Sequence, residues 1–185
     1  MNTALLLVDI QQDYFPGGRM ELIGSTAASQ EARRLLMTFR EKNLPIIHVQ
    51  HISTREGATF FLPDTEGINF HKNVTPRPNE TIIEKHYPNS FRETELRNTL
   101  EGKNIQQLTI CGMMSHMCID ATVRAAFDDG YNCIVAHDAC ATRNLTFNGV
   151  DIPAEHVHAG FMAALGSVYA QVLHAETIID TLRGE

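Results

Sequence analysis

Residues 107–118 read QLTICGMMSHMC, and this stretch decides the fold class. Its first part, residues 107–111, is a short apolar run that predicts a buried strand. The residues after it predict a helix that ends at Gly130, because apolar side chains recur on one helical face: Ile119, Val123, Ala126 and Phe127. A strand that passes into a helix is the repeating unit of an α/β domain.

Similar apolar runs recur along the chain. The expected strands cover residues 4–8, 45–50, 81–83, 107–111, 132–136 and 170–173. Their Leu, Ile and Val content is nearly continuous, which is typical of parallel strands buried on both faces. We therefore expect a single α/β domain over residues 1–185, with a doubly wound, mostly parallel six-stranded sheet and helices on both faces.

Helix signals lie between these strands. Ser90 and Glu93 have the spacing of a capping box before a helix that should stop near Gly102. Pro153 suits the first turn of a later helix. The buried face of that helix would include Val157, Phe161 and Leu165.

The segment 53–79 interrupts the alternation of strands and helices. It is rich in Pro and Gly, and it carries Phe60, Phe61 and Phe70 without a helical or strand period. A loop of this length inside a compact domain is usually a lid or a binding loop.

Composition and charge exclude several classes of protein. The formal net charge is −7 and no basic block occurs, so nucleic acid is not an expected partner. The apolar N-terminal run is too short for a membrane span and lacks the cationic start of a secretion signal. The four cysteines form no Cys-x-x-Cys pair, which favours reduced thiols and a cytoplasmic protein.

Three reactive residue types follow expected strand ends. Ligands of open α/β sheets bind beyond the carboxyl ends of the strands, where Asp9, Lys85 and Cys118 stand. Cys118 also lies near the start of a helix, whose unpaired N–H groups and dipole lower a thiol pKa. Taken singly, Asp9 could cap a turn and Lys85 could be a solvated surface charge.

The other cysteines are weaker candidates for a nucleophile. Cys111 and Cys133 fall within expected strands, where cysteine is usually a small buried hydrophobe. Cys140 is the rival, because it also stands beyond an expected strand end. No clear helix begins after Cys140, so Cys118 is favoured.

Four segments in order carry a resemblance to a known family. They are LLVDIQQDYF at 6–15, KHYPNSF at 85–91 with Thr94 and Leu96, CGMMSHMC at 111–118 and DACAT at 138–142. Together they resemble the isochorismatase-like cysteine hydrolases, which include nicotinamidases, N-carbamoylsarcosine amidohydrolases and streptothricin hydrolases. The resemblance covers nearly the whole chain and implies a Rossmann-type three-layer fold.

The resemblance also implies roles for particular residues. Asp9 would take the proton of Cys118, and Lys85 would stabilise the ionised pair. A cis peptide between Met113 and Met114 would help the N–H groups of Met114 and Cys118 form an oxyanion hole. The family suggests a homodimer or a homotetramer.

A metal is not expected in this chain. Nicotinamidases of this group bind a divalent ion through an Asp-x-His sequence just after the second strand. Here Gln50 stands where that aspartate would be, so His51 and His71 are interpreted as pocket or loop residues. No other cofactor is expected.

The expected substrate pocket is a set of polar and aromatic residues near these segments: Gln11, Phe15, Gln50, His51, Phe60, Phe61 and His116. Aromatic residues in a long loop can equally pack the loop down or bury a subunit contact. His116 could instead have a structural role near the helix start.

The leading functional hypothesis is hydrolysis of a C–N amide bond in a small molecule through a Cys118 thioester. One alternative is the acid-catalysed vinyl ether cleavage of isochorismatases, which generally lack the cysteine. Another is a non-catalytic binding protein that has kept the fold.

Overall fold

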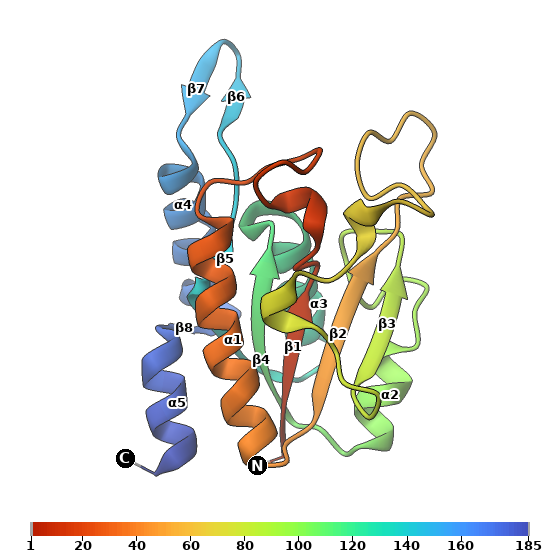
Figure 1. Cartoon of the computed structure of the whole chain (residues 1–185). Helices are drawn as coiled ribbons and strands as arrows, with labels where there is room; N and C mark the ends of the chain where they lie inside the picture. Colours follow the sequence, from red (N-terminus) through yellow and green to blue (C-terminus); the bar gives the residue numbers. More distant parts are fainter. Residues whose placement is uncertain (1, 185) are drawn as a thin grey trace.

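The computed structural model describes residues 2–184, and a six-stranded sheet forms its centre (Figure 1). Every neighbouring pair of strands in this sheet is parallel, in the order β3-β2-β1-β4-β5-β8. The strands are β1 (Thr3–Val8), β2 (Ile46–His51), β3 (Thr81–Lys85), β4 (Gln107–Met113), β5 (Asn132–Ala141) and β8 (Gln171–Leu173). The predicted six-stranded parallel sheet is confirmed.

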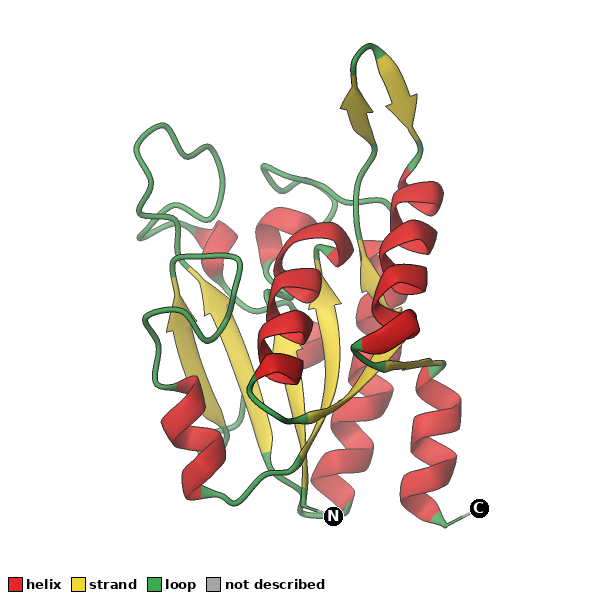
Figure 2. Ribbon diagram, turned by 180° about the vertical axis from the view of Figure 1, so that it is seen from behind, coloured by secondary structure: helices red, strands yellow, loops and turns green. Residues whose placement is uncertain are grey.

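Helices cover both faces of the sheet and complete three layers (Figure 2). One face carries α1 (Ser25–Glu41) and α5 (Ala175–Arg183), and the other carries α2 (Leu96–Gly102), α3 (Asp120–Asp128) and α4 (Ala154–Val168). The sequence of α1 explains its packing, because its buried side chains recur every three or four residues: Ala28, Ala32, Leu35, Leu36 and Phe39. Among the helices of residues 2–184, none combines the length and apolar character of a membrane span.

The centre of the sheet contains its topological switch point. β1 pairs with β2 on one side and with β4 on the other, so the direction of winding reverses between β1 and β4. These two strands approach closely at Gly112, where a Cβ atom would lie 2.0 Å from the carbonyl oxygen of Val8. Gly112 also has a φ of +132°, so this position requires glycine. Ligand crevices of doubly wound sheets open at such a point.

Strand β5 is longer than predicted. It continues to Ala141, and its register with β4 shifts between Ile110 and Gly112. Cys140 therefore lies within a strand and not beyond its end. The sequence did not predict the antiparallel hairpin of β6 (Leu145–Phe147) and β7 (Val150–Ile152), which follows β5 and projects from the body of the molecule (Figure 1).

The helix α2 ends at Gly102 as predicted, but the predicted capping box of Ser90 and Glu93 is wrong. The helix begins at Leu96, and Glu93 has a left-handed backbone with a φ of 56°. The Ser90 hydroxyl instead bonds the Thr122 hydroxyl of α3 at 2.8 Å. The prediction for α4 is closer, because Pro153 immediately precedes the helix. Val157 and Leu165 of α4 are buried, whereas Phe161 is only half-buried.

The long connection between β2 and β3 contains two short 3₁₀ turns, Glu66–Ile68 and Lys72–Val74. The side chain of Gln11 holds this connection against the end of β2. Its amide nitrogen donates to the carbonyl oxygens of His51 and Ile68, each at 2.9 Å, and its oxygen accepts from the His51 N–H at 2.7 Å. The connection is therefore tied to the sheet edge where the switch point lies.

Candidate active site

Asp9 stands directly after β1, at the switch point. Its φ of 52° is left-handed, a conformation that Asp tolerates better than most residues because its short side chain can bond locally. Its backbone N–H donates to the Val49 carbonyl at 3.1 Å, and its side chain is fully buried. The end of β1 thus places a carboxylate beneath the crevice.

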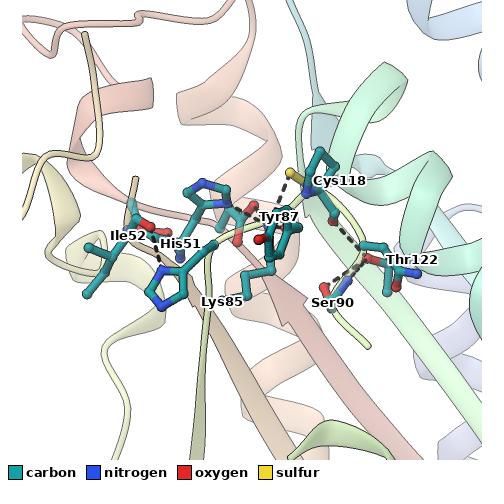
Figure 3. Close-up of polar contacts among 12 residues, drawn as sticks. His51, Ile52, Lys85, Tyr87, Ser90, Cys118 and Thr122 are labelled. Atoms are coloured by element: carbon teal, nitrogen blue, oxygen red, sulfur yellow. Dashed lines mark hydrogen bonds and ion pairs between the residues drawn. The ribbon is translucent and has the colours of Figure 1, made fainter. Parts of the chain in front are cut away.

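Lys85 is the last residue of β3, and its ammonium group lies at the centre of the site (Figure 3). The Nζ atom is 2.8 Å from Asp9 Oδ2, 3.2 Å from Cys118 Sγ and 2.9 Å from His51 Nδ1. It also donates to the Tyr87 carbonyl at 3.0 Å. Burial opposes the charge of Lys85, but Asp9 and Cys118 outweigh this effect and raise the lysine pKa above its usual value.

Cys118 lies in a short π-helical turn, Ser115–Ile119, that directly follows β4 and leads into α3. The peptide bond between Met113 and Met114, at the start of this segment, is cis. Burial and then the Asp9 carboxylate raise the pKa of the Cys118 thiol, although Lys85 acts in the opposite direction. The sequence predicted a lowered thiol pKa at a helix start. That prediction is wrong, because burial dominates at this position.

The charge balance of the cluster shows how Cys118 can still ionise. Loss of its proton to bulk water would leave a net negative charge in a buried site, which is costly. Transfer of the same proton to Asp9 leaves the total charge of the cluster unchanged. The buried arrangement therefore favours a neutral thiol at rest and an internal base for its activation.

The other three cysteines have different surroundings. All are buried and reduced, and none of them lines the cavity above Cys118 within the described residues. Cys140 donates its thiol to the Ala136 carbonyl at 3.3 Å, inside the irregular part of β5. Burial raises the pKa of Cys140 to about 12. The geometry favours Cys118 over Cys140 as the accessible thiol.

Three side chains at the site carry atoms of the kind that bind metal ions. Candidate ligand atoms of Asp9, His51 and Cys118 lie within 4.8 Å of one another. The Lys85 ammonium contacts all three side chains, so it occupies the position a cation would take and would repel one. Gln50 offers no replacement ligand, because its amide donates to the Ile68 carbonyl at 2.9 Å. These residues do not fit a divalent metal.

His51, at the end of β2, is a neutral member of the cluster. Burial is the main reason that its pKa falls to about 4. Because Lys85 donates to Nδ1, the proton of the neutral ring resides on Nε2. His51 can therefore offer one N–H donor without carrying a charge at neutral pH.

A cavity of about 590 Å³ opens above Cys118, within the usual size range of small-molecule sites. Its wall includes six residues assigned to the site from sequence: His51, Phe60, Phe61, Met114, His116 and Cys118. It also includes residues that sequence reasoning did not find: Tyr14, Met20, Arg55, Tyr87 and Arg143 among them. Tyr14 and Tyr87 lie inside the family segments quoted above, and Arg143 directly follows the last of them.

Three residues expected in the pocket do not line this cavity: Gln11, Phe15 and Gln50. Gln11 and Gln50 use their amides to hold the loop carbonyl of Ile68. Phe15 is buried and stacks on His71 with ring centroids 3.8 Å apart. Because these side chains already bond or stack on residues of the loop, they hold the loop in place and do not line the cavity.

Phe60 and Phe61 of the long loop both line the cavity and pack the loop down. Phe61 lies 4.6 Å from the Tyr14 ring and 5.0 Å from the Phe60 ring, measured between centroids. Asp13 fixes the same segment by accepting the Phe61 N–H at 2.6 Å and the Arg19 N–H at 3.1 Å. His116 bonds the Thr142 hydroxyl at 2.5 Å, so it too has a structural contact.

The fold and site define the class of the protein: an α/β enzyme fold with a buried acid, ammonium and thiol at its switch point. The family model of the isochorismatase domain matches residues 3–176, so the chain belongs to the isochorismatase family of hydrolases. This confirms the resemblance seen in the sequence.

Three relatives illustrate the family. YddQ of Bacillus subtilis, an uncharacterized isochorismatase family protein, is 51% identical over 179 residues, which cover 97% of this chain and 99% of YddQ. A streptothricin hydrolase of Streptomyces noursei is 32% identical, over 82% of this chain and 51% of that protein. The crystal structure of an isochorismatase from Pseudomonas putida is 36% identical with a TM-score of 0.90, and the match covers 95% of this chain and 89% of that one.

Proposed function

We propose that this hydrolase cleaves a C–N amide bond of a small molecule through a thioester on Cys118. The observation that carries the proposal is the Lys85 ammonium, which lies 2.8 Å from the Asp9 carboxylate and 3.2 Å from the Cys118 sulfur, and Cys118 lines the cavity. A thiol beside a buried base and a cation is suited to nucleophilic acyl transfer. The similarity to a streptothricin hydrolase supports a hydrolytic reaction.

In the first half-reaction, Asp9 takes the proton of Cys118 as the sulfur adds to the amide carbonyl. The electron pair of the C=O bond moves to oxygen, where the N–H groups of Met114 and Cys118 form the proposed oxyanion hole. Collapse of this intermediate breaks the C–N bond. Protonated Asp9 gives its proton to the departing amine, which leaves the acyl group on sulfur.

In the second half-reaction, Asp9 takes a proton from water as the water oxygen adds to the thioester carbonyl. The C–S bond then breaks, the carboxylic acid is released, and the proton returns to Cys118. Lys85 stays protonated throughout and stabilises each negative charge that develops on Asp9 or on sulfur. No redox step is involved, and the net reaction consumes one water.

A panel of small primary and cyclic amides, assayed for ammonia or amine release, tests the proposal. We expect turnover by the wild-type protein, none above background by Cys118→Ala, and most of the wild-type rate by the matched variant Cys140→Ala. Chelator-treated protein should keep its activity because Lys85 occupies the cation position. Turnover of a vinyl ether by Cys118→Ala, with no amide cleaved by wild type, would contradict the proposal.

We also propose that the chain assembles as a homodimer or a homotetramer. Phe147 and Val150 support this, because they are 70% and 63% exposed on the projecting hairpin. Light scattering coupled to size-exclusion chromatography measures the mass directly. A monomer at micromolar concentration would contradict the assembly.

A further inference from the structure

Two arginines on the cavity wall carry charges that are not neutralised. Arg143 follows the end of β5, and Arg55 lies in the loop after β2. Of the nine other arginines, six form ion pairs with carboxylates: Arg34, Arg40, Arg92, Arg97, Arg124 and Arg183. Within residues 2–184, no such ion pair is found for the guanidinium groups of Arg143 and Arg55.

The backbone around Arg143 is held in place. The preceding residue, Thr142, accepts the Ile23 N–H through its carbonyl at 3.0 Å, and its hydroxyl bonds His116 at 2.5 Å. Arg55 lies in a loop that is closed by a hydrogen bond from the Ser53 N–H to the Phe61 carbonyl at 2.8 Å. The two arginines thus reach the cavity from separate segments. The backbone next to Arg143 is held by more hydrogen bonds than the backbone next to Arg55.

The charge of the cavity wall is opposite to that of the whole chain. The net charge of the protein is −7, yet within the described residues the cavity wall contains no Asp or Glu. The buried Asp9 is already paired with Lys85. Burial is the main cause of the lowered pKa of His116, and the positive charge of Arg143 lowers it further. A cationic opening in an acidic protein selects for anions.

The geometry points to a carboxylate-bearing amide as the substrate, with Arg143 binding the carboxylate while the amide carbon meets Cys118. This inference rests on the proposed function and names its substrate class. A guanidinium fork matches the two oxygens of a carboxylate, which favours this anion. Apolar side chains of Met20, Phe60 and Phe61 lie on the same wall and suit a short hydrocarbon link. Arg55 supplies a second positive charge from the loop.

Isosteric pairs of substrates test the inference. Succinamic acid is compared with succinamide, and glutaramic acid with glutaramide, by ammonia release. Wild-type kcat/KM should favour each acid over its diamide by at least about tenfold, and Arg143→Gln should bring the acid-to-diamide ratio of kcat/KM close to one. Arg143→Lys should keep only part of the preference for the acid, because lysine keeps the positive charge but lacks the paired N–H donors of the guanidinium group. Arg33→Gln, an exposed site on α1 outside the cavity, changes the net charge equally and should keep the preference.

A binding measurement separates failure of the inference from failure of the proposed function. Calorimetry on Cys118→Ala should show glutarate binding at least about tenfold tighter than in the Cys118→Ala, Arg143→Gln double variant, with a much smaller difference for glutaramide. Equal hydrolysis of acids and diamides by wild type would overturn the inference and leave the amidase function standing. If no amide is cleaved, the proposed function fails. Glutarate affinity that does not depend on Arg143 would then overturn the anion site as well.

Discussion

The floor of the cavity and its outer wall are built from different parts of the chain. Cys118 lines the cavity, and Asp9 and Lys85 lie buried behind it. These three residues, called the floor, are at most 5% exposed and stand at or just beyond the ends of β1, β3 and β4. Arg55 and Arg143 on the wall are exposed and belong to connecting segments. We infer that the sheet positions the residues that carry out the reaction, whereas the loops position the residues that select the substrate. Changes on the floor should therefore affect kcat, and changes on the wall should affect KM.

Among the substitutions that leave the Cys118 nucleophile in place, Asp9→Asn should have the largest effect. An amide cannot accept the thiol proton, so kcat should fall by roughly 10²–10⁴-fold, the usual contribution of a positioned base. Stopped assays with the best amide of the panel measure this. Asp128→Asn is the matched control, because Asp128 is exposed at the end of α3. An Asp9→Asn enzyme with near-normal kcat would remove Asp9 from the role of base.

Lys85→Met should lower activity and stability together. Removal of the ammonium takes away a charge contribution of about 3 kcal/mol to the transition state. It also leaves the buried Asp9 carboxylate unpaired, which costs roughly 3–5 kcal/mol of unfolding free energy. Rate assays and urea unfolding test both effects, with Lys103→Met as a surface control. A wild-type free energy of unfolding in Lys85→Met would show that the ion pair between Lys85 and Asp9 does not stabilise the fold.

The sequence predicted the positions of the floor residues much better than those of the wall residues, because strand ends follow a sequence pattern and loop contacts do not. Asp9, Lys85 and Cys118 follow apolar runs, and parallel strands bring their carboxyl ends together whatever the loops do. Gln11 and Gln50 were misplaced because their amides turn to the loop carbonyl of Ile68, a long-range contact that has no periodic signal. The thiol pKa was predicted with the wrong sign because burial cannot be read from a helix start alone.

A smaller effect on activity is expected when the Asp13 carboxylate, which holds part of the cavity wall through hydrogen bonds, is removed. Asp13→Ala removes the acceptor of the Phe61 and Arg19 N–H groups, a local loss of roughly 1–3 kcal/mol. The loop that carries Arg55 should become mobile, so KM should rise by about tenfold while kcat stays within about threefold. Trypsin should also cut after Arg55 faster than in the control Glu66→Ala. A fall in kcat at constant KM would mean that Asp13 supports the floor instead.

The smallest expected effect is a pH dependence of stability. Burial lowers the pKa of His51 to about 4, whereas the unfolded chain binds this proton near its ordinary value of 6.5. Between these two values the unfolded state binds more protons, so stability is present above about pH 6.5 and is lost as the pH falls toward 4. Melting temperatures over this range should decline, and His51→Gln should flatten part of the slope. An unchanged slope in His51→Gln would assign the effect to the other buried histidines.

Differential alkylation tests the central claim most directly. Native protein is treated with iodoacetamide at a series of pH values, and the modified peptides are mapped over time. Cys118 should be labelled before Cys111, Cys133 and Cys140, because it alone among these thiols lines the cavity. Its rate should keep rising toward alkaline pH, since its thiol pKa is raised. First labelling at Cys140, with Cys118 unmodified, would contradict the account.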